Sequence, residues 1–229
     1  MKNWLAWVAL CGSLMTIPQC GDNTNSKAIL PTSSNLTEEV IDNTRNNVLF
    51  TIDDGPSEYT SDIAKTLDSL EYKWIFFVVT RSVRESTKQN LIEILKWGHS
   101  IGNHSYDHSN FQTLNIDKAK EQILVSDSII ASIYEEAGIQ RDKKYIRYPY
   151  GNQPPKYYRD EFNKFLDSLW YEMPMFWHMD VDLLDFRQKP IQQSIDRMKD
   201  WDTILLHERP WTKETIKDIV RSIDSKKAI

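Results

Sequence analysis

The feature that most constrains the fold is an alternation of short apolar runs with longer stretches of helical periodicity, which begins after residue 47. Strand–helix alternation implies parallel strands with helices outside them, in an open doubly wound sheet or in a closed barrel. The expected strands are 47–52, 74–79, 99–103, 145–148, 175–181 and 203–207. Three helices are expected from apolar positions on one face, at Ile63 and Leu67, at Leu91 and Leu95, and at Ile123 and Ile130. Three more helices are expected near 156–169, 190–200 and 213–224.

Polar side chains follow or end almost every expected strand. In a barrel, the carboxyl ends of the strands converge on one mouth, where active sites are built, so these positions favour a barrel over an open sheet. The residues concerned are Asp53, Asp54, His104, His108, Arg147, Asp182 and His207.

Two adjacent carboxylates, Asp53 and Asp54, stand in "FTIDDGPS" at the end of the first apolar run. Adjacent side chains on a strand point to opposite faces, so both can share one pocket only if the strand ends there. Gly55 and Pro56 are expected to end it. The alternative is a simple acidic turn between a strand and a loop.

Two histidines, His104 and His108, stand four residues apart in "GNHSYDHSN". If this stretch forms one helical turn, both imidazoles lie on the same face and reach one ion. Two histidines with one carboxylate and an open position for water form a standard catalytic zinc set, and Asp53 or Asp54 can supply that carboxylate. The alternative is a pair of solvated histidines.

The first twenty residues differ from the rest of the chain. A weakly basic start with Lys2 precedes an apolar stretch at 4–17 that is short for a bilayer span, so residues 1–20 are expected to be a signal peptide. "TIPQC" resembles a lipoprotein processing site with Cys20 as the lipidated residue; ordinary secretion and an uncleaved anchor are the alternatives. Residues 21–46 are polar and predict a disordered linker before a folded domain at 47–229.

Composition limits the partners and the redox chemistry. The formal charge of −5 comes from interspersed charges without a basic run, so nucleic acid is not an expected partner. Both cysteines, Cys11 and Cys20, fall in or beside the leader, which leaves the expected folded domain without a disulfide or a thiolate metal site. His99 and His178 are expected to be structural histidines.

Five stretches in order, "TIDDGP", "HSYDH", "RYPYG", "DVDLLDF" and "LLHE", resemble the five motifs of the NodB-like polysaccharide deacetylases, carbohydrate esterase family 4. The resemblance covers roughly residues 47–210. It implies an α/β fold, a distorted (β/α) barrel with six to eight strands. The expected enzyme is a monomer in the cell envelope; the leader predicts secretion across the inner membrane, and Cys20 would carry the lipid anchor.

The resemblance further implies a role for each matching residue. Asp53 would be the catalytic base and Arg147 would hold its carboxylate; His207 would be the acid, oriented by Asp182. The backbone N–H of Tyr150 would face the oxyanion. The implied metal ligands, for zinc or alternatively cobalt or another divalent ion, are Asp54, His104 and His108.

Three residues are expected to touch substrate. Leu205 and Phe186 would line the pocket for the acetyl methyl, with Phe186 in place of the usual tryptophan of the family. Trp211, in the loop after His207, is a candidate platform for stacking a sugar. Glu208 stands where aspartate is common, and little effect is expected from this change.

The predicted function is the metal-dependent removal of N-acetyl groups from N-acetylated amino-sugar polymers. One alternative keeps the enzyme but changes the substrate to a non-sugar amide or an O-acetyl ester. A second alternative is a surface-tethered binding module that keeps the metal site, although binding alone needs neither Asp53 nor His207.

Overall fold

The computed structural model describes residues 49–182, 195–198 and 202–227. The expected signal peptide, Cys20 and the linker lie outside these residues. So do Phe186 and most of the helix expected at 190–200.

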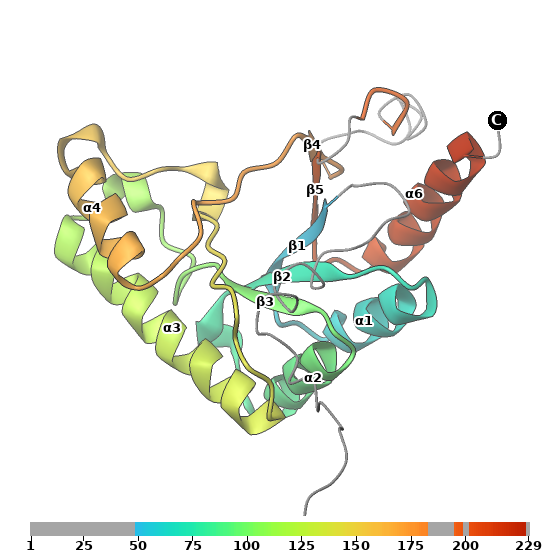
Figure 1. The fold of residues 1–229 in the computed structure, drawn as a ribbon, viewed down its shortest axis with the longest axis horizontal. Helices are drawn as coiled ribbons and strands as arrows, with labels where there is room; N and C mark the ends of the chain where they lie inside the picture. The colour runs from blue at the N-terminus through green and yellow to red at the C-terminus, as the bar shows by residue number, and fades with distance from the viewer. Residues whose placement is uncertain (1–48, 183–194, 199–201, 228–229) are drawn as a thin grey trace, which may run out of the picture. The chain divides into compact units, whose positions relative to one another are not determined.

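Five parallel strands form one sheet in the order β3-β2-β1-β5-β4 (Figure 1). Read from the other edge, the order is β4-β5-β1-β2-β3, so the strands follow one another as they do along the chain, with β5 followed by β1. Strands added always in the same direction give this order, as in a barrel, whereas a doubly wound sheet reverses direction. The predicted α/β fold is confirmed. The strands are β1 (Leu49–Gly55), β2 (Trp74–Val78), β3 (Ser100–Asn103), β4 (Met179–Asp180) and β5 (Thr203–His207).

The strand expected at 145–148 is wrong. In its place, the described chain has isolated parallel bridges, one of which joins Asn103 to Ile146. The ladder stops there because the next carbonyl, that of Arg147, accepts a hydrogen bond from the His104 ring at 2.9 Å, and because Pro149 has no N–H to continue it.

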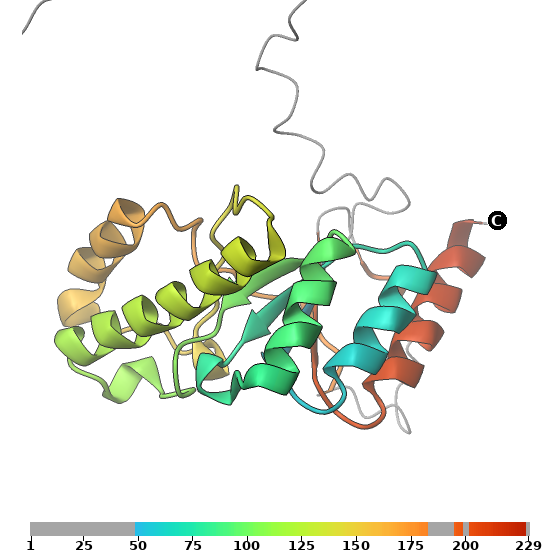
Figure 2. The same cartoon turned by 90° about the horizontal axis from the view of Figure 1, so that it is seen from below.

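The helices pack beside one another in the order α6, α1, α2, α3 and α4. Figure 2 shows α3, α2, α1 and α6 in a row along one face of the sheet. Among the described residues, no helix is both long enough and apolar enough to cross a membrane. The bounds are α1 (Thr60–Ser69), α2 (Glu85–Lys96), α3 (Ile116–Ala137), α4 (Lys156–Ser168) and α6 (Thr212–Lys227).

The strands alternate between a helix-facing side and an inner side. On β1, Phe50 and Ile52 join the main apolar core with the helices, and on β5 Ile204 and Leu206 do the same. Because alternate strand residues face opposite sides, the residues between them, Thr51 among them, face the inner side. Among the described residues, Asp53 and His207 stand at or near the carboxyl ends of β1 and β5.

Candidate active site

The Asp53–Asp54 doublet is shaped by an irregularity in β1. The strand was expected to end at the doublet. It continues instead to Gly55. Between the pairs Ile52–Phe76 and Gly55–Val78, β1 holds one residue more than β2, and Asp54 adopts a φ of 71°. Such a bulge breaks the alternation of side chains, so both carboxylates reach the same pocket.

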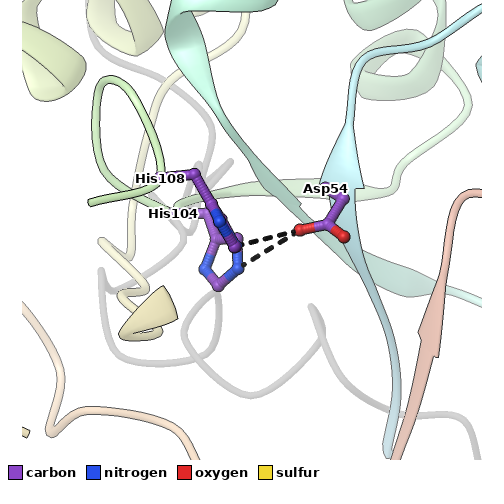
Figure 3. Close-up of side chains that lie close together, drawn as sticks. All are labelled: Asp54, His104 and His108. Atoms are coloured by element: carbon purple, nitrogen blue, oxygen red, sulfur yellow. Dashed lines mark ion pairs between the residues drawn. The ribbon is translucent and has the colours of Figure 1, made fainter. Parts of the chain in front are cut away.

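The two histidines meet Asp54 without a helical turn, contrary to the expected geometry. His104 directly follows β3, and His108 lies in a loop with a φ of 66°. Asp54 Oδ1 lies 3.2 Å from His108 Nε2 and 3.7 Å from His104 Nε2 (Figure 3). The three side chains offer ligand atoms that all lie within 4.8 Å of one another.

The histidine loop is held by buried side chains that the sequence analysis did not single out. The Asn103 amide oxygen accepts the Ser105 N–H at 2.8 Å, and the Ser105 hydroxyl accepts the His108 N–H at 3.0 Å. From α3, Gln122 accepts the Tyr106 N–H at 3.1 Å. These hydrogen bonds tie the loop to itself and to α3.

The electrostatics of this cluster suit a divalent ion. His104 is buried, which lowers its pKa and favours the neutral ring, and its Nδ1–H donates to the Arg147 carbonyl, so the Nε2 lone pair faces Asp54. Burial would raise the pKa of Asp54, but the hydrogen bond with His108 and the electrostatic attraction of the surrounding histidines outweigh it and hold the pKa well below its usual range. One carboxylate and two imidazoles fit zinc or a similar ion.

A buried ion pair lies on one side of the cluster. Arg147 Nη1 donates to Asp53 Oδ1 at 2.7 Å, and the two residues are only 1% and 3% exposed. The guanidinium lies 4.4 Å from the Phe77 ring centroid and 5.6 Å from that of Trp177. Asp53 Oδ2 remains on the side of His104, 3.6 Å from its Nε2.

A more exposed pair includes His207, at the end of the neighbouring strand β5. His207 Nδ1 donates to Asp182 Oδ2 at 2.6 Å, and the backbone N–H of His207 donates to the same oxygen at 3.0 Å. Burial alone would lower the pKa of His207, but the hydrogen bond with Asp182 and the charges of Asp53 and Asp54 outweigh it and raise the pKa. His207 on β5 stands opposite Asp53 on β1, so the two ion pairs lie next to each other.

The remaining expected site residues are more dispersed. The Tyr150 ring lies 4.6 Å from that of His108, and its backbone has a φ of 59°. Leu205 is buried on β5, two residues before His207. Trp211 is 56% exposed just before α6, and no described contact joins it to the cluster.

Glu208 has a larger structural role than expected. It is 4% exposed, and its carboxylate accepts the Ser57 N–H at 3.0 Å and the Thr60 hydroxyl at 2.6 Å. A Cβ at Gly55 would collide with this carboxylate. Glu208 thus fastens the β1–α1 loop, and no local sequence signal indicates it because its partners lie about 150 residues away.

Comparison with known proteins gives one family match and several relatives. A family model described as polysaccharide deacetylase matches residues 41–171. A bifunctional xylanase/deacetylase of Pseudobutyrivibrio xylanivorans is 28% identical over 86% of this chain. The peptidoglycan-N-acetylmuramic acid deacetylase PdaC of Bacillus subtilis is 32% identical over 75% of it. The chain spans only 31% and 34% of the length of these two relatives.

A solved structure supports the fold alone. A CE4 family pseudoenzyme from Bacillus anthracis superposes with a TM-score of 0.63 at 22% identity, over 78% of this chain and 60% of that one. Since a pseudoenzyme has this fold, the fold does not by itself establish catalysis. Catalytic activity depends on the side chains placed on this fold.

Proposed function

The chain belongs to the polysaccharide deacetylase family, as the five motifs indicated, and we propose that it is a metal-dependent hydrolase that removes N-acetyl groups from amino-sugar polymers. The observation that carries the proposal is the placement of two carboxylate-paired groups, Arg147–Asp53 and Asp182–His207, on neighbouring strands beside the Asp54–His104–His108 cluster. Amide hydrolysis needs a base, an acid and an electrophile, and this arrangement supplies a candidate for each.

The proposed metal ligands are Asp54, His104 and His108. A bound divalent ion would lower the pKa of water and polarise the amide carbonyl. The protein prepares the ligands itself, because the Arg147 carbonyl fixes the His104 tautomer and Asn103 and Ser105 fix the loop that carries His108. Zinc is the proposed ion, with cobalt or another divalent ion as alternatives.

Asp53 is the proposed general base. Arg147 engages only Oδ1 of this carboxylate, so Oδ2 is left on the side of His104, where it can accept a proton from the attacking water. A positioned base typically contributes ~10² to 10⁴-fold to the rate. Arg147 in turn is immobilised by the Thr51 hydroxyl and by the Phe77 ring.

His207 is the proposed general acid. An amide nitrogen must gain a proton before it leaves, and the raised pKa of His207 keeps its ring protonated to higher pH. Asp182 holds Nδ1, which leaves Nε2 to donate the proton. The oxyanion would face the N–H of Tyr150, which lies in the first turn of the short 3-10 helix η4 (Pro149–Gly151), where N–H groups have no partner inside the helix.

The acyl and sugar contacts are proposed for Leu205, Phe186 and Trp211. Leu205 is buried beside His207, which suits a wall for the acetyl methyl. Trp211 is exposed, as a stacking platform must be. Phe186 lies outside the described residues, so its role rests on the motif alone.

We also propose secretion and anchoring at the cell envelope. Residues 1–20 would act as a lipoprotein signal and residues 21–46 as a spacer that separates the anchor from the domain, which agrees with relatives named as peptidoglycan deacetylases. Labelling with a radioactive fatty acid should mark the full-length chain but not Cys20→Ser. Equal labelling of both would remove Cys20 as the anchor.

Acetate release tests the enzymatic proposal. The full chain is incubated with peptidoglycan, chitin oligomers and an acetylated exopolysaccharide, with and without a chelator. We expect release from at least one N-acetylated polymer, loss with chelator, and recovery with added Zn²⁺ or Co²⁺. His104→Ala should lose activity, whereas His178→Ala, which alters an exposed histidine outside the cluster, should keep it.

The same assay separates the alternatives. Acetate from O-acetyl esters only would make the protein an esterase. Zinc binding with no turnover on any substrate would favour a binding module. Full activity in a preparation shown to be free of metal would contradict the mechanism.

A further inference from the structure

The two oxygens of Asp54 have different surroundings. Oδ1 faces both histidine rings, 3.2 Å from His108 Nε2 and 3.7 Å from His104 Nε2 (Figure 3). Oδ2 lies instead 3.4 Å from Nη2 of Arg209, which the five family motifs do not include. One oxygen of the carboxylate is thus directed at the proposed metal position, and the other is engaged by a guanidinium.

Arg209 is held in place by its own loop. Its Nη1 donates to the Glu208 carbonyl at 3.0 Å, and its backbone N–H donates to the hydroxyl of Thr212 at 3.0 Å. Thr212 is 1% exposed and also donates to the His207 carbonyl at 2.6 Å. The loop therefore presents the guanidinium in a fixed direction.

The same loop is tied directly to the strand that carries Asp54. The Glu208 N–H donates to the Asp53 carbonyl at 3.1 Å, and the Glu208 carboxylate packs against Gly55. Both neighbours of Asp54 are therefore in contact with the residue before Arg209. A displacement of this loop would therefore move Asp54. Replacement of Arg209 by an uncharged residue would remove the cation that contacts Oδ2 of Asp54.

We propose that Arg209 is a positioning residue that engages Oδ2 of Asp54, so that only Oδ1 is offered to the metal. This inference rests on the proposed function. A carboxylate left free can bind an ion through both oxygens, and the second oxygen would occupy a position that a catalytic site keeps open. Groups that hold ligands from outside typically change metal affinity by about 10- to 100-fold when they are removed.

The sign of the effect distinguishes positioning from simple charge. A guanidinium near a cation repels it, so if charge alone mattered, the loss of Arg209 would strengthen metal binding. The Arg209 side chain is 42% exposed, which weakens that repulsion through solvent screening. Loss of orientation at Asp54 should therefore dominate, and binding should weaken.

Zinc titration against a chromophoric chelator tests the proposal on the full chain. Arg209→Gln should bind Zn²⁺ about 10- to 100-fold more weakly than the unaltered chain. Arg209→Lys, which keeps the charge but not the planar fork, should recover part of that loss. The matched control is Arg221→Gln, an exposed arginine on α6 that pairs with Asp218, and it should bind as the unaltered chain does.

A kinetic comparison completes the test. With the metal saturating, Arg209→Gln should lower kcat and leave KM for a neutral N-acetylated oligomer nearly unchanged. Zinc binding that is equal or tighter in Arg209→Gln would overturn the proposal while the proposed function stands. A rise in KM confined to substrates that carry a carboxylate, with unchanged zinc affinity, would make Arg209 a substrate contact and overturn it as well. If the unaltered chain binds no zinc, the metal assignment fails, and this inference fails with it.

Discussion

The two ion pairs beside the proposed metal-ligand cluster both join a carboxylate to a basic side chain, but their surroundings differ. Asp53 and Arg147 have side chains only 4% and 1% exposed, and the guanidinium is enclosed by aromatic rings. Asp182 and His207 have side chains that are each 23% exposed. We call them the buried pair and the rim pair.

The difference in burial suits the two pairs to different proposed roles. A buried carboxylate that is fixed by arginine and by packing has one geometry, which suits a base that must address one water molecule. A half-buried histidine can respond to its carboxylate partner and to solvent, which suits an acid whose pKa must lie near the working pH. The buried pair should therefore govern stability and the rim pair should govern the pH profile.

The largest expected effect is on the stability of the buried pair. Arg147→Met keeps much of the apolar stem but leaves Asp53 as an uncompensated buried charge, which should cost about 3–5 kcal/mol of unfolding free energy. Asp182→Asn on the rim should cost about 1 kcal/mol or less. Urea denaturation measures both.

A double variant separates charge from packing in that result. Arg147→Met combined with Asp53→Asn removes the unpaired charge, so it should be more stable than Arg147→Met alone. Equal or lower stability of the double variant would show that packing, and not the buried charge, causes the loss. Similar costs for Arg147→Met and Asp182→Asn would remove the distinction between the two pairs.

The next effect concerns the leaving group. His207→Ala should lower kcat on an N-acetyl substrate by about 10²- to 10⁴-fold, because the amine cannot depart without a proton. An activated aryl acetate ester has a leaving group that needs no proton, so its hydrolysis should be largely spared. Equal losses on both substrates would give His207 a different role, such as binding.

The smallest effect is a shift of the pH profile. With protonated His207 as the proposed general acid, kcat should fall as pH rises through its pKa, and Asp182 raises that pKa. Asp182→Asn should therefore move the alkaline fall to lower pH. Asp218→Asn, which alters an exposed carboxylate on α6, is the control and should leave the profile in place. A shift to higher pH would contradict the assignment of the rim pair.

The sequence predicted the parts of the fold that depend on local pattern. The apolar run at 47–52, which includes Phe50 and Ile52, correctly indicated β1, although the strand continues to Gly55. The expected strand at 145–148 was wrong because the carbonyl of Arg147 bonds to the distant His104 and not to a neighbouring strand. The local sequence pattern does not show that a distant side chain takes the hydrogen bond of a backbone carbonyl.

The geometry of the site was less predictable than its composition. The residues singled out at strand ends do converge, but the doublet meets through a bulge at Asp54 and the histidines meet through a loop. Neither the bulge nor the loop conformation has an unambiguous signal in the sequence. The role of Glu208 was underestimated and Arg209 was missed for the same reason, since their partners in the β1 region lie about 150 residues away along the chain.

One measurement tests the central claim most directly: zinc content and acetate release determined on the same preparations of the unaltered chain, Asp53→Asn and His104→Ala. The account assigns His104 to the metal and Asp53 to proton transfer, so the two variants should fail differently. Asp53→Asn should retain zinc and release acetate at about 10²- to 10⁴-fold lower rate, whereas His104→Ala should lose both. Full turnover by Asp53→Asn, or by a preparation without metal, would contradict the account.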